Sequence, residues 1–174
     1  MSIRGIDFAA LSLKDALDLA ILVEEEAQER YEEFVAQMEA HHTGEAAEFF
    51  RFMAGNEAKH GAELSERRLR LFPGEPRSVR REQLWDIEAP EYDEARMFMS
   101  ARQALEVALR CEEKAHGFFV AALPNISNPE VRALFEELRD EEVEHQDLVR
   151  RQMAKLPPGP DADPEDYADD PVAQ

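Results

Sequence analysis

Residues 57–60 read Glu-Ala-Lys-His and residues 142–145 read Glu-Val-Glu-His, and both stretches lie within long runs of helix-forming sequence. A glutamate and a histidine three positions apart lie one turn apart on the same side of a helix. Another glutamate stands in the helical run before each pair, Glu24 before the first and Glu112 before the second. We therefore interpret the chain as two copies of one helical hairpin.

Four long segments carry apolar residues at helical spacing, and recognisable start and stop signals bound them. We predict helices over about 12–42, 45–72, 92–123 and 128–156. Ser12 is suited to cap the first helix, and Asn128 followed by Pro129 is suited to begin the fourth. Pro73 and Gly74 stop the second helix.

The connections between these helices predict their topology. Short turns join the first helix to the second and the third to the fourth, whereas residues 73–90 are long enough to run back along a bundle. We therefore predict an all-α fold, a ferritin-like four-helix bundle with one long crossover between helices two and three. We expect this bundle to form one domain over residues 1–156, followed by a disordered acidic, Pro-rich tail over 157–174.

The composition of the chain excludes several classes of partner. The chain has 174 residues, of which 44% are hydrophobic, and its formal net charge of −19 repels nucleic acids and anionic membranes. No run of about 18 uncharged apolar residues is present, so we expect neither a nucleic-acid partner nor a membrane span. Cys111 is the only cysteine, which excludes an intrachain disulfide. Because residues 1–10 also lack an export signal, we expect a cytoplasmic protein.

The stripe that faces the bundle core is apolar on every predicted helix, except for ionisable groups near its middle. These groups are Glu24, Glu57, His60, Glu112, Glu142 and His145. Buried carboxylates that face one another repel and lose their hydration, so a stable bundle needs cations among them. Two divalent ions balance four carboxylates. The oxygen and nitrogen donors suit iron or manganese, and zinc would also bind.

Two further pairs have the same spacing but lie elsewhere on their helices. Glu39 and His42 fall at the fraying end of the first predicted helix, and Glu113 and His116 lie to the side of the core stripe. We interpret His42 as a surface residue. We interpret His116 as a packing residue or as a support for the ligands.

Tyr31 lies two turns after Glu24 on the core stripe, where its hydroxyl can reach a metal-bound carboxylate. Phe119 takes the matching place after Glu112, so the second half has no such hydroxyl. We predict that Tyr31 has a catalytic role.

Together, the order of Glu24, Tyr31 and Glu57-x-x-His60, with its partial repeat in the second half, resembles the rubrerythrin branch of the ferritin-like family over about residues 13–155. The resemblance implies a di-iron protein that reduces hydrogen peroxide or oxidises ferrous iron, and a homodimer. It also assigns roles to the six ligands. Those roles are bridging for Glu57 and Glu142, terminal carboxylate for Glu24 and Glu112, and terminal imidazole for His60 and His145.

The chain departs from the rubrerythrin pattern at three points. The four cysteines of a rubredoxin module are missing, so reductant has to come from an external electron donor protein. Ala115 stands where rubrerythrins tend to place another glutamate, and Phe119 replaces the second tyrosine.

Two functions remain open on the sequence. One is a redox enzyme in which hydrogen peroxide or dioxygen oxidises two ferrous ions together. The other is a ferroxidase or iron-storage protein whose acidic surface attracts cations. We rank a di-iron hydroxylase and a non-enzymatic helical scaffold below these two.

Overall fold

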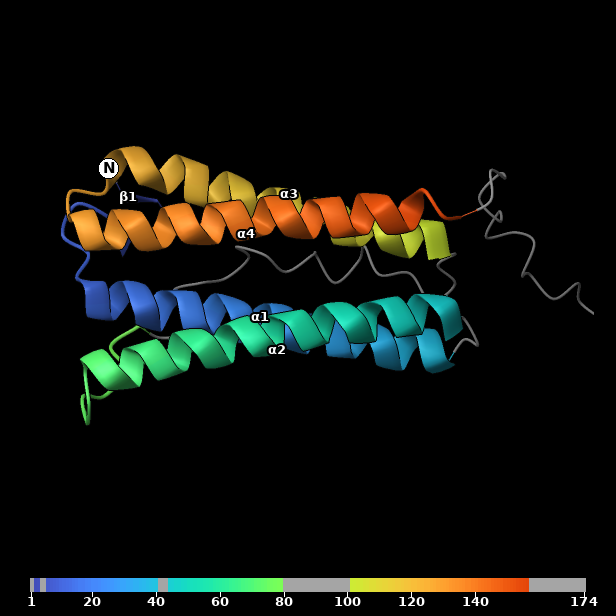
Figure 1. Ribbon diagram of the computed structural model, residues 1–174, viewed down its shortest axis with the longest axis horizontal. Helices are drawn as coiled ribbons and strands as arrows, with labels where there is room; N and C mark the ends of the chain where they lie inside the picture. Colours follow the sequence, from blue (N-terminus) through green and yellow to red (C-terminus); the bar gives the residue numbers. More distant parts are fainter. Residues whose placement is uncertain (1, 4–5, 41–43, 80–100, 157–174) are drawn as a thin grey trace, which may run out of the picture.

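In the computed structural model, long helices lie side by side along one axis (Figure 1). The structure describes residues 2–3, 6–40, 44–79 and 101–156. The long helices of these ranges are α1 (Leu13–Ala40), α2 (Gly44–Leu71), α3 (Ala101–Ala122) and α4 (Pro129–Met153). A 3-10 turn, η2 (Leu123–Asn125), joins α3 to α4. Before α1, the strands β1 (Ser2–Ile3) and β2 (Ile6–Asp7) pair antiparallel.

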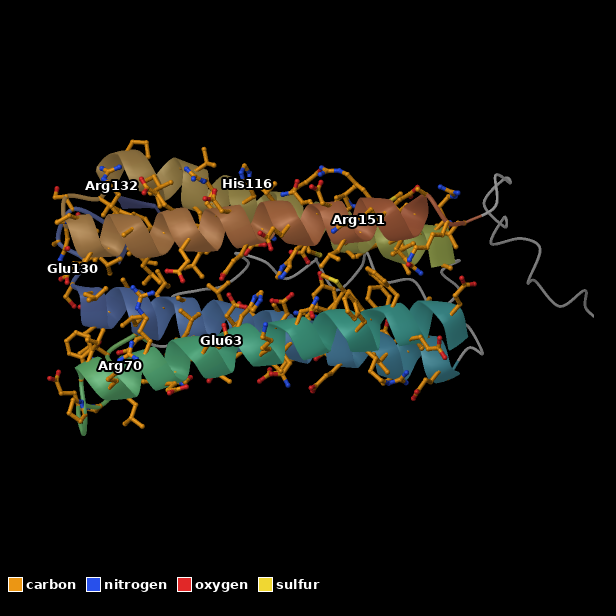
Figure 2. The ribbon with its side chains drawn as sticks, in the orientation of Figure 1. Glu63, Arg70, His116, Glu130, Arg132 and Arg151 are labelled. Carbon is orange, nitrogen blue, oxygen red and sulfur yellow. The ribbon has the colours of Figure 1, made fainter. Side chains whose placement is uncertain are left out.

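The helices form two antiparallel hairpins, α1 with α2 and α3 with α4 (Figure 1). The end of α2, near Arg70, and the start of α4, near Glu130, lie at the same end of the bundle (Figure 2). α3 begins at the opposite end from where α2 stops. This arrangement confirms the predicted all-α, ferritin-like bundle with one long crossover. No helix in the described ranges is both long and apolar enough to cross a bilayer.

Local signals in the sequence set the helix ends. The Ser12 hydroxyl accepts a hydrogen bond from the backbone amide of Asp15 at 3.1 Å, at the start of α1. The Asn128 side chain accepts from two first-turn amides of α4, at 2.9 and 3.4 Å, and Pro129 takes the first helical position. α2 ends at Leu71, and three residues later Gly74 has a φ of 76°, which favours glycine.

Two predicted boundaries lie outside the described residues. The third helix is predicted to begin near residue 92, and the structure describes α3 from Ala101 onward. The predicted tail, 157–174, falls outside the described ranges as well.

The apolar core consists of two clusters, one toward each end of the bundle. The first contains the starts of α1 and α4 and the end of α3, and the second contains the end of α1 and the starts of α2 and α3. The middle of every helix lies between them. In the first cluster, Phe8 contacts the rings of Phe118 and Phe135 edge-on, each at 5.9 Å between centroids. The segment before α1 therefore seals that end of the core.

A buried ion pair ties the first hairpin together near this end. Asp18 is 0% exposed and accepts hydrogen bonds from Arg68 Nε at 2.7 Å, Lys14 Nζ at 2.9 Å and the Ser78 amide at 3.0 Å. Burial raises the pKa of Asp18, but the hydrogen bonds from Arg68, Lys14 and Ser78 outweigh it and lower the pKa overall. The pair therefore fixes the chain that follows α2 onto α1.

Candidate metal centre

The six predicted ligands converge in the middle of the bundle, between the two apolar clusters. α1 supplies one, α2 two, α3 one and α4 two, and they are Glu24, Glu57, His60, Glu112, Glu142 and His145. The four glutamates are 0–4% exposed. This burial follows from their place on the core stripe of each helix.

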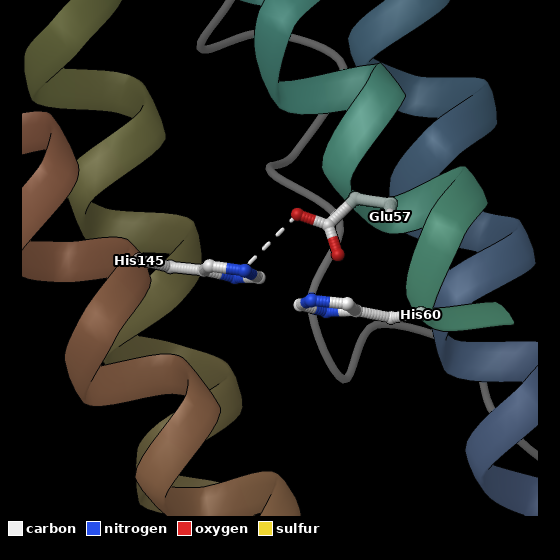
Figure 3. A group of neighbouring side chains, drawn as sticks. All are labelled: Glu57, His60 and His145. Carbon is white, nitrogen blue, oxygen red and sulfur yellow. Dashed lines mark ion pairs between the residues drawn. The ribbon is translucent and has the colours of Figure 1, made fainter. Parts of the chain in front are cut away.

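His145 lies among three of these carboxylates. Its Nδ1 atom is 3.2 Å from Glu112 Oε2, 3.5 Å from Glu57 Oε1 (Figure 3) and 4.0 Å from Glu142 Oε2. Burial lowers the pKa of His145, but the hydrogen bond and charge of Glu112 outweigh burial and raise the pKa overall. The neighbouring carboxylates thus favour the protonated form of His145.

His60 lies parallel to His145, with ring centroids 5.0 Å apart and planes 4° apart (Figure 3). Its Nδ1 atom is buried, is 4.0 Å from Glu24 Oε2, and has no hydrogen-bond partner within the described ranges. Burial lowers the pKa of His60, and the charge of His145 lowers it further. A neutral imidazole with an unpaired ring nitrogen is suited to bind a metal ion.

Glu24 shows how crowded the carboxylates are. Burial raises its pKa to about 7, despite a hydrogen bond with Glu57 and the charge of His145. Repulsion from Glu112 and Glu141 acts in the same direction as burial. Burial and repulsion among neighbouring carboxylates thus favour the protonated form of Glu24.

Tyr31 crosses from the first hairpin to the second. Its hydroxyl donates a hydrogen bond to Glu112 Oε1, and its ring stacks on Phe50 at 5.9 Å between centroids. Burial raises the pKa of Tyr31 well above its usual range, and the charge of Glu112 adds to the shift. The hydroxyl thus reaches a predicted ligand from α3, although Glu24 is the ligand that shares its own stripe.

Three groups of side chains place their ligand atoms within 4.8 Å of one another, close enough for one ion each. They are Glu24 with His60 and Glu141, Glu57 with His60 and His145, and Glu112 with Glu142 and His145. Oxygen and imidazole nitrogen are the donors that iron, manganese and zinc accept. The donor set and the unpaired nitrogen of His60 therefore fit a pair of such ions.

Sequence reasoning missed Glu141, which is half-buried beside Glu24 and His60. The signal was present, because Leu138, Glu141 and His145 follow a three-then-four step along α4. The predicted core stripe passes through Glu142 instead, by a four-then-three step.

The two secondary Glu-x-x-His pairs do not join the centre. His116 is half-buried on the side of α3 away from α1 and α2 (Figure 2), and Glu113 pairs with Arg150 at 3.2 Å. Glu39 is exposed and pairs with Arg51. His42 lies outside the described residues.

Comparison with known proteins identifies the family of the chain. The rubrerythrin family model matches residues 15–153, with a second match over residues 103–171. Among solved structures, an uncharacterised conserved protein from Magnetospirillum magnetotacticum MS-1 is 31% identical and superposes with a TM-score of 0.67. That alignment covers 86% of this chain and 98% of the other. No curated protein matches the chain.

The family match spans α1 to α4 and includes all the residues that converge at mid-bundle. The solved neighbour shares the fold over nearly its whole length. The chain belongs to the rubrerythrin family, within the ferritin-like di-iron carboxylate superfamily.

Proposed function

We propose that the protein is a di-iron oxidoreductase of rubrerythrin type, which reduces hydrogen peroxide, or dioxygen, as two ferrous ions are oxidised. The observation that supports this most strongly is the convergence of four buried glutamates and two histidines between two apolar clusters. Two bound iron ions would supply two electrons to one oxidant molecule. Manganese or zinc could occupy the same ligands.

We assign Glu24 and His60 to one ion and Glu112 and His145 to the other. Glu57 and Glu142 would bridge the two. In support, Glu57 shares a possible ligand group with both histidines. The assignment also gives each ion one nitrogen and several oxygens, which iron accepts in either oxidation state.

The surrounding residues suit a two-electron oxidation. Four carboxylates balance two divalent ions and stabilise added positive charge when each ion loses an electron. Tyr31 would act through Glu112, by keeping one oxygen of that carboxylate in a fixed direction. The apolar clusters close the centre to bulk water from both ends of the bundle, which strengthens these interactions.

The electrons for further turnover would come from a separate donor protein. Because Cys111 is the only cysteine in the sequence, the sequence cannot build a four-thiolate iron module to reduce the centre. We also propose that the protein is a homodimer, as the family resemblance implies.

Stopped-flow spectroscopy of the di-ferrous protein tests the reaction. We expect faster oxidation by hydrogen peroxide than by dioxygen, with about one peroxide consumed per iron pair. Without reductant, the reaction should stop after this single event. The variant Glu142→Ala should lose the signal, whereas the surface variant Glu39→Ala should keep it.

Iron oxidation for storage is the second candidate. The net charge of −19 favours it, because an acidic protein raises the local concentration of cations. Faster oxidation by dioxygen, followed by growth of a ferric mineral signal with excess ferrous iron, would assign the protein to this class instead.

A further inference from the structure

We propose that Glu141 is a seventh metal ligand, which completes the position formed by Glu24 and His60 and receives cations from a cleft between α2 and α4. This inference rests on the proposed metal-dependent function and adds to it. It assigns both a ligand and a route of entry.

The cleft opens from the surface onto the candidate metal centre. Its volume is about 200 Å³, and His60 forms part of its wall. The other polar lining residues are Glu63, Arg67, Glu137 and Glu141. Figure 2 shows Glu63 on α2. Three carboxylates against one guanidinium make the cleft attractive to cations.

Arg67 neutralises the negative charge at only one place along the cleft. Its Nη1 atom lies 2.9 Å from Glu137 Oε2, so its guanidinium pairs with a carboxylate one turn before Glu141. Both partners of that pair are partly exposed, at 32% and 54%. An exposed ion pair of this kind is weak and rearranges easily. A cation in the cleft can therefore take the place of the Arg67 guanidinium beside Glu137.

Glu141 lies where the cleft meets the buried ligands. Its carboxylate belongs to the group in which ligand atoms from Glu24 and His60 are all within 4.8 Å of one another. These three side chains come from α1, α2 and α4, and so converge from three directions. His60 Nδ1 contributes a buried nitrogen that no described residue engages in a hydrogen bond. The position is distinct from the group of Glu112, Glu142 and His145.

The charge of Glu141 changes which metal ions the centre favours. Glu24, Glu57, Glu112 and Glu142 balance two divalent ions, and Glu141 adds a fifth carboxylate. The extra negative charge favours ions of higher charge at this position. Glu141 is half-buried and lines the cleft, whereas Glu24 is 4% exposed. An incoming ion therefore meets Glu141 before Glu24.

Cobalt(II) titration provides a test that does not depend on activity. We expect the full-length protein to bind two Co²⁺ ions, with visible absorption bands that report the coordination of each ion. In Glu141→Gln, one of the two ions should bind about tenfold or more weakly, and its bands should change. Glu141→Asp should recover part of the lost affinity.

Glu137→Gln is the matched control, because it removes a carboxylate from the same cleft wall one turn away. It should leave both spectra unchanged and change the affinity for either ion far less than Glu141→Gln does. Removing a half-buried charge at Glu141 should not lower the melting temperature of the metal-free protein. If Glu141→Gln nevertheless unfolds, Glu141→Asp, with its shorter side chain, should still show weaker binding of one ion.

The outcomes separate this inference from the proposed function. If Glu141→Gln binds two ions with unchanged affinity and spectrum, Glu141 is not a ligand, and the rest of the metal centre stands. If Glu141→Gln and Glu137→Gln weaken Co²⁺ binding equally, Glu141 is likewise not a ligand. Binding then depends only on the total charge of the cleft. If the wild-type protein binds no Co²⁺, both the inference and the metal centre are wrong.

Discussion

The Tyr31 hydroxyl on α1 donates a hydrogen bond to the Glu112 carboxylate on α3, and so connects the two hairpins at the candidate metal centre. The other oxygen of Glu112 lies 3.2 Å from His145 Nδ1. Both oxygens of this carboxylate thus have partners from other helices. Because the pKa of Tyr31 is well above its usual range, the hydroxyl remains a donor at neutral pH.

We predict that Tyr31→Phe destabilises the protein and slows oxidation of the centre without loss of metal. Removing the donor leaves one oxygen of the buried Glu112 without this partner, which costs about 1–3 kcal/mol in the free energy of unfolding. Urea denaturation and stopped-flow oxidation measure the two effects. Phe50→Leu is the control, since it loses ring packing against Tyr31, Phe34 and Phe49 but keeps the Tyr31 hydroxyl. An unchanged oxidation rate in Tyr31→Phe would reduce the role of Tyr31 to core packing.

Much of the fold follows from local sequence patterns. The helical spacing of the apolar residues predicts the helices. Side chains such as Ser12 and Asn128 mark where helices begin, because a capping side chain binds backbone amides within a few residues of itself. The length of the segment between α2 and α3 predicts the crossover. The convergence of the candidate ligands at mid-bundle could be predicted for the same reason, as an ionisable group on an otherwise apolar stripe is conspicuous at any position along a helix.

Contacts between distant segments could not be predicted in this way. Asp18 and Arg68 look like ordinary surface charges in the sequence, and only the packing of α1 on α2 brings them together at 2.7 Å. Phe8 lies outside every periodic segment, yet it packs on Phe118 and Phe135. Glu141 adjoins a predicted ligand, and its rotation toward His60 depends on how α4 faces α2.

Metal ions should raise the melting temperature of the protein. Ions that bind the folded site and not the unfolded chain stabilise it, by about 2.7 kcal/mol at one hundred times the dissociation constant. We expect Glu57→Ala or Glu142→Ala to abolish most of the rise caused by Zn²⁺ in differential scanning calorimetry. Glu39→Ala, at an exposed site, should retain it. Equal losses in all three variants would contradict the ligand assignment.

The stability of the metal-free protein should fall as pH rises from about 4.5 to 7. Burial raises the pKa of Glu24 from its ordinary value of 4.5 to about 7, so the folded state binds more protons than the unfolded state within this window. Metal binding has to displace this proton, and affinity should therefore increase with pH up to about 7.

Denaturation curves at several pH values and calorimetric titrations in two buffers measure these effects. Glu24→Gln should flatten the pH dependence of stability in this window. Glu25→Gln, which alters an exposed pair with Arg77, should leave it unchanged. A slope that persists in Glu24→Gln would assign the proton to another group.

Asp18 should have the opposite dependence on pH. Its pKa is lowered in the folded protein, so its contribution to stability is present above its ordinary value of 3.8 and is lost as pH falls through the folded pKa. At pH 7 Asp18→Asn leaves the buried Arg68 without a counter-charge, at a cost of about 3 kcal/mol or more in the free energy of unfolding.

Urea denaturation of wild type and Asp18→Asn from pH 7 down to pH 2 measures this contribution. The difference between the two proteins should narrow below about pH 4. Arg77→Ala, which breaks the exposed pair with Glu25, should cost no more than about 1 kcal/mol at any pH. A constant difference across the whole range would show that Asp18 acts through packing rather than charge.

Gly61, on α2, faces Glu24 on α1 at the candidate metal centre. A Cβ atom built at Gly61 would lie 3.4 Å from Glu24 Cβ, whereas one built at Gly55, on the same helix, would meet nothing within 4 Å. Gly55→Ala should therefore stabilise the protein by about 0.5–1 kcal/mol, through the backbone entropy of glycine.

Gly61→Val adds two methyl groups beyond a Cβ position that already touches Glu24, so we expect them to press on the Glu24 side chain. We expect a loss of about 1–3 kcal/mol in the free energy of unfolding, together with weaker binding of one Co²⁺ ion, because Glu24 moves relative to His60. Thermal denaturation and cobalt titration of the Gly61→Val and Gly55→Ala variants measure both effects. If Gly61→Val binds two ions as tightly as Gly55→Ala, then either Glu24 is not a ligand or α1 yields at this point without moving it. Glu24→Gln distinguishes these two explanations, since only a ligand weakens cobalt binding when its charge is removed.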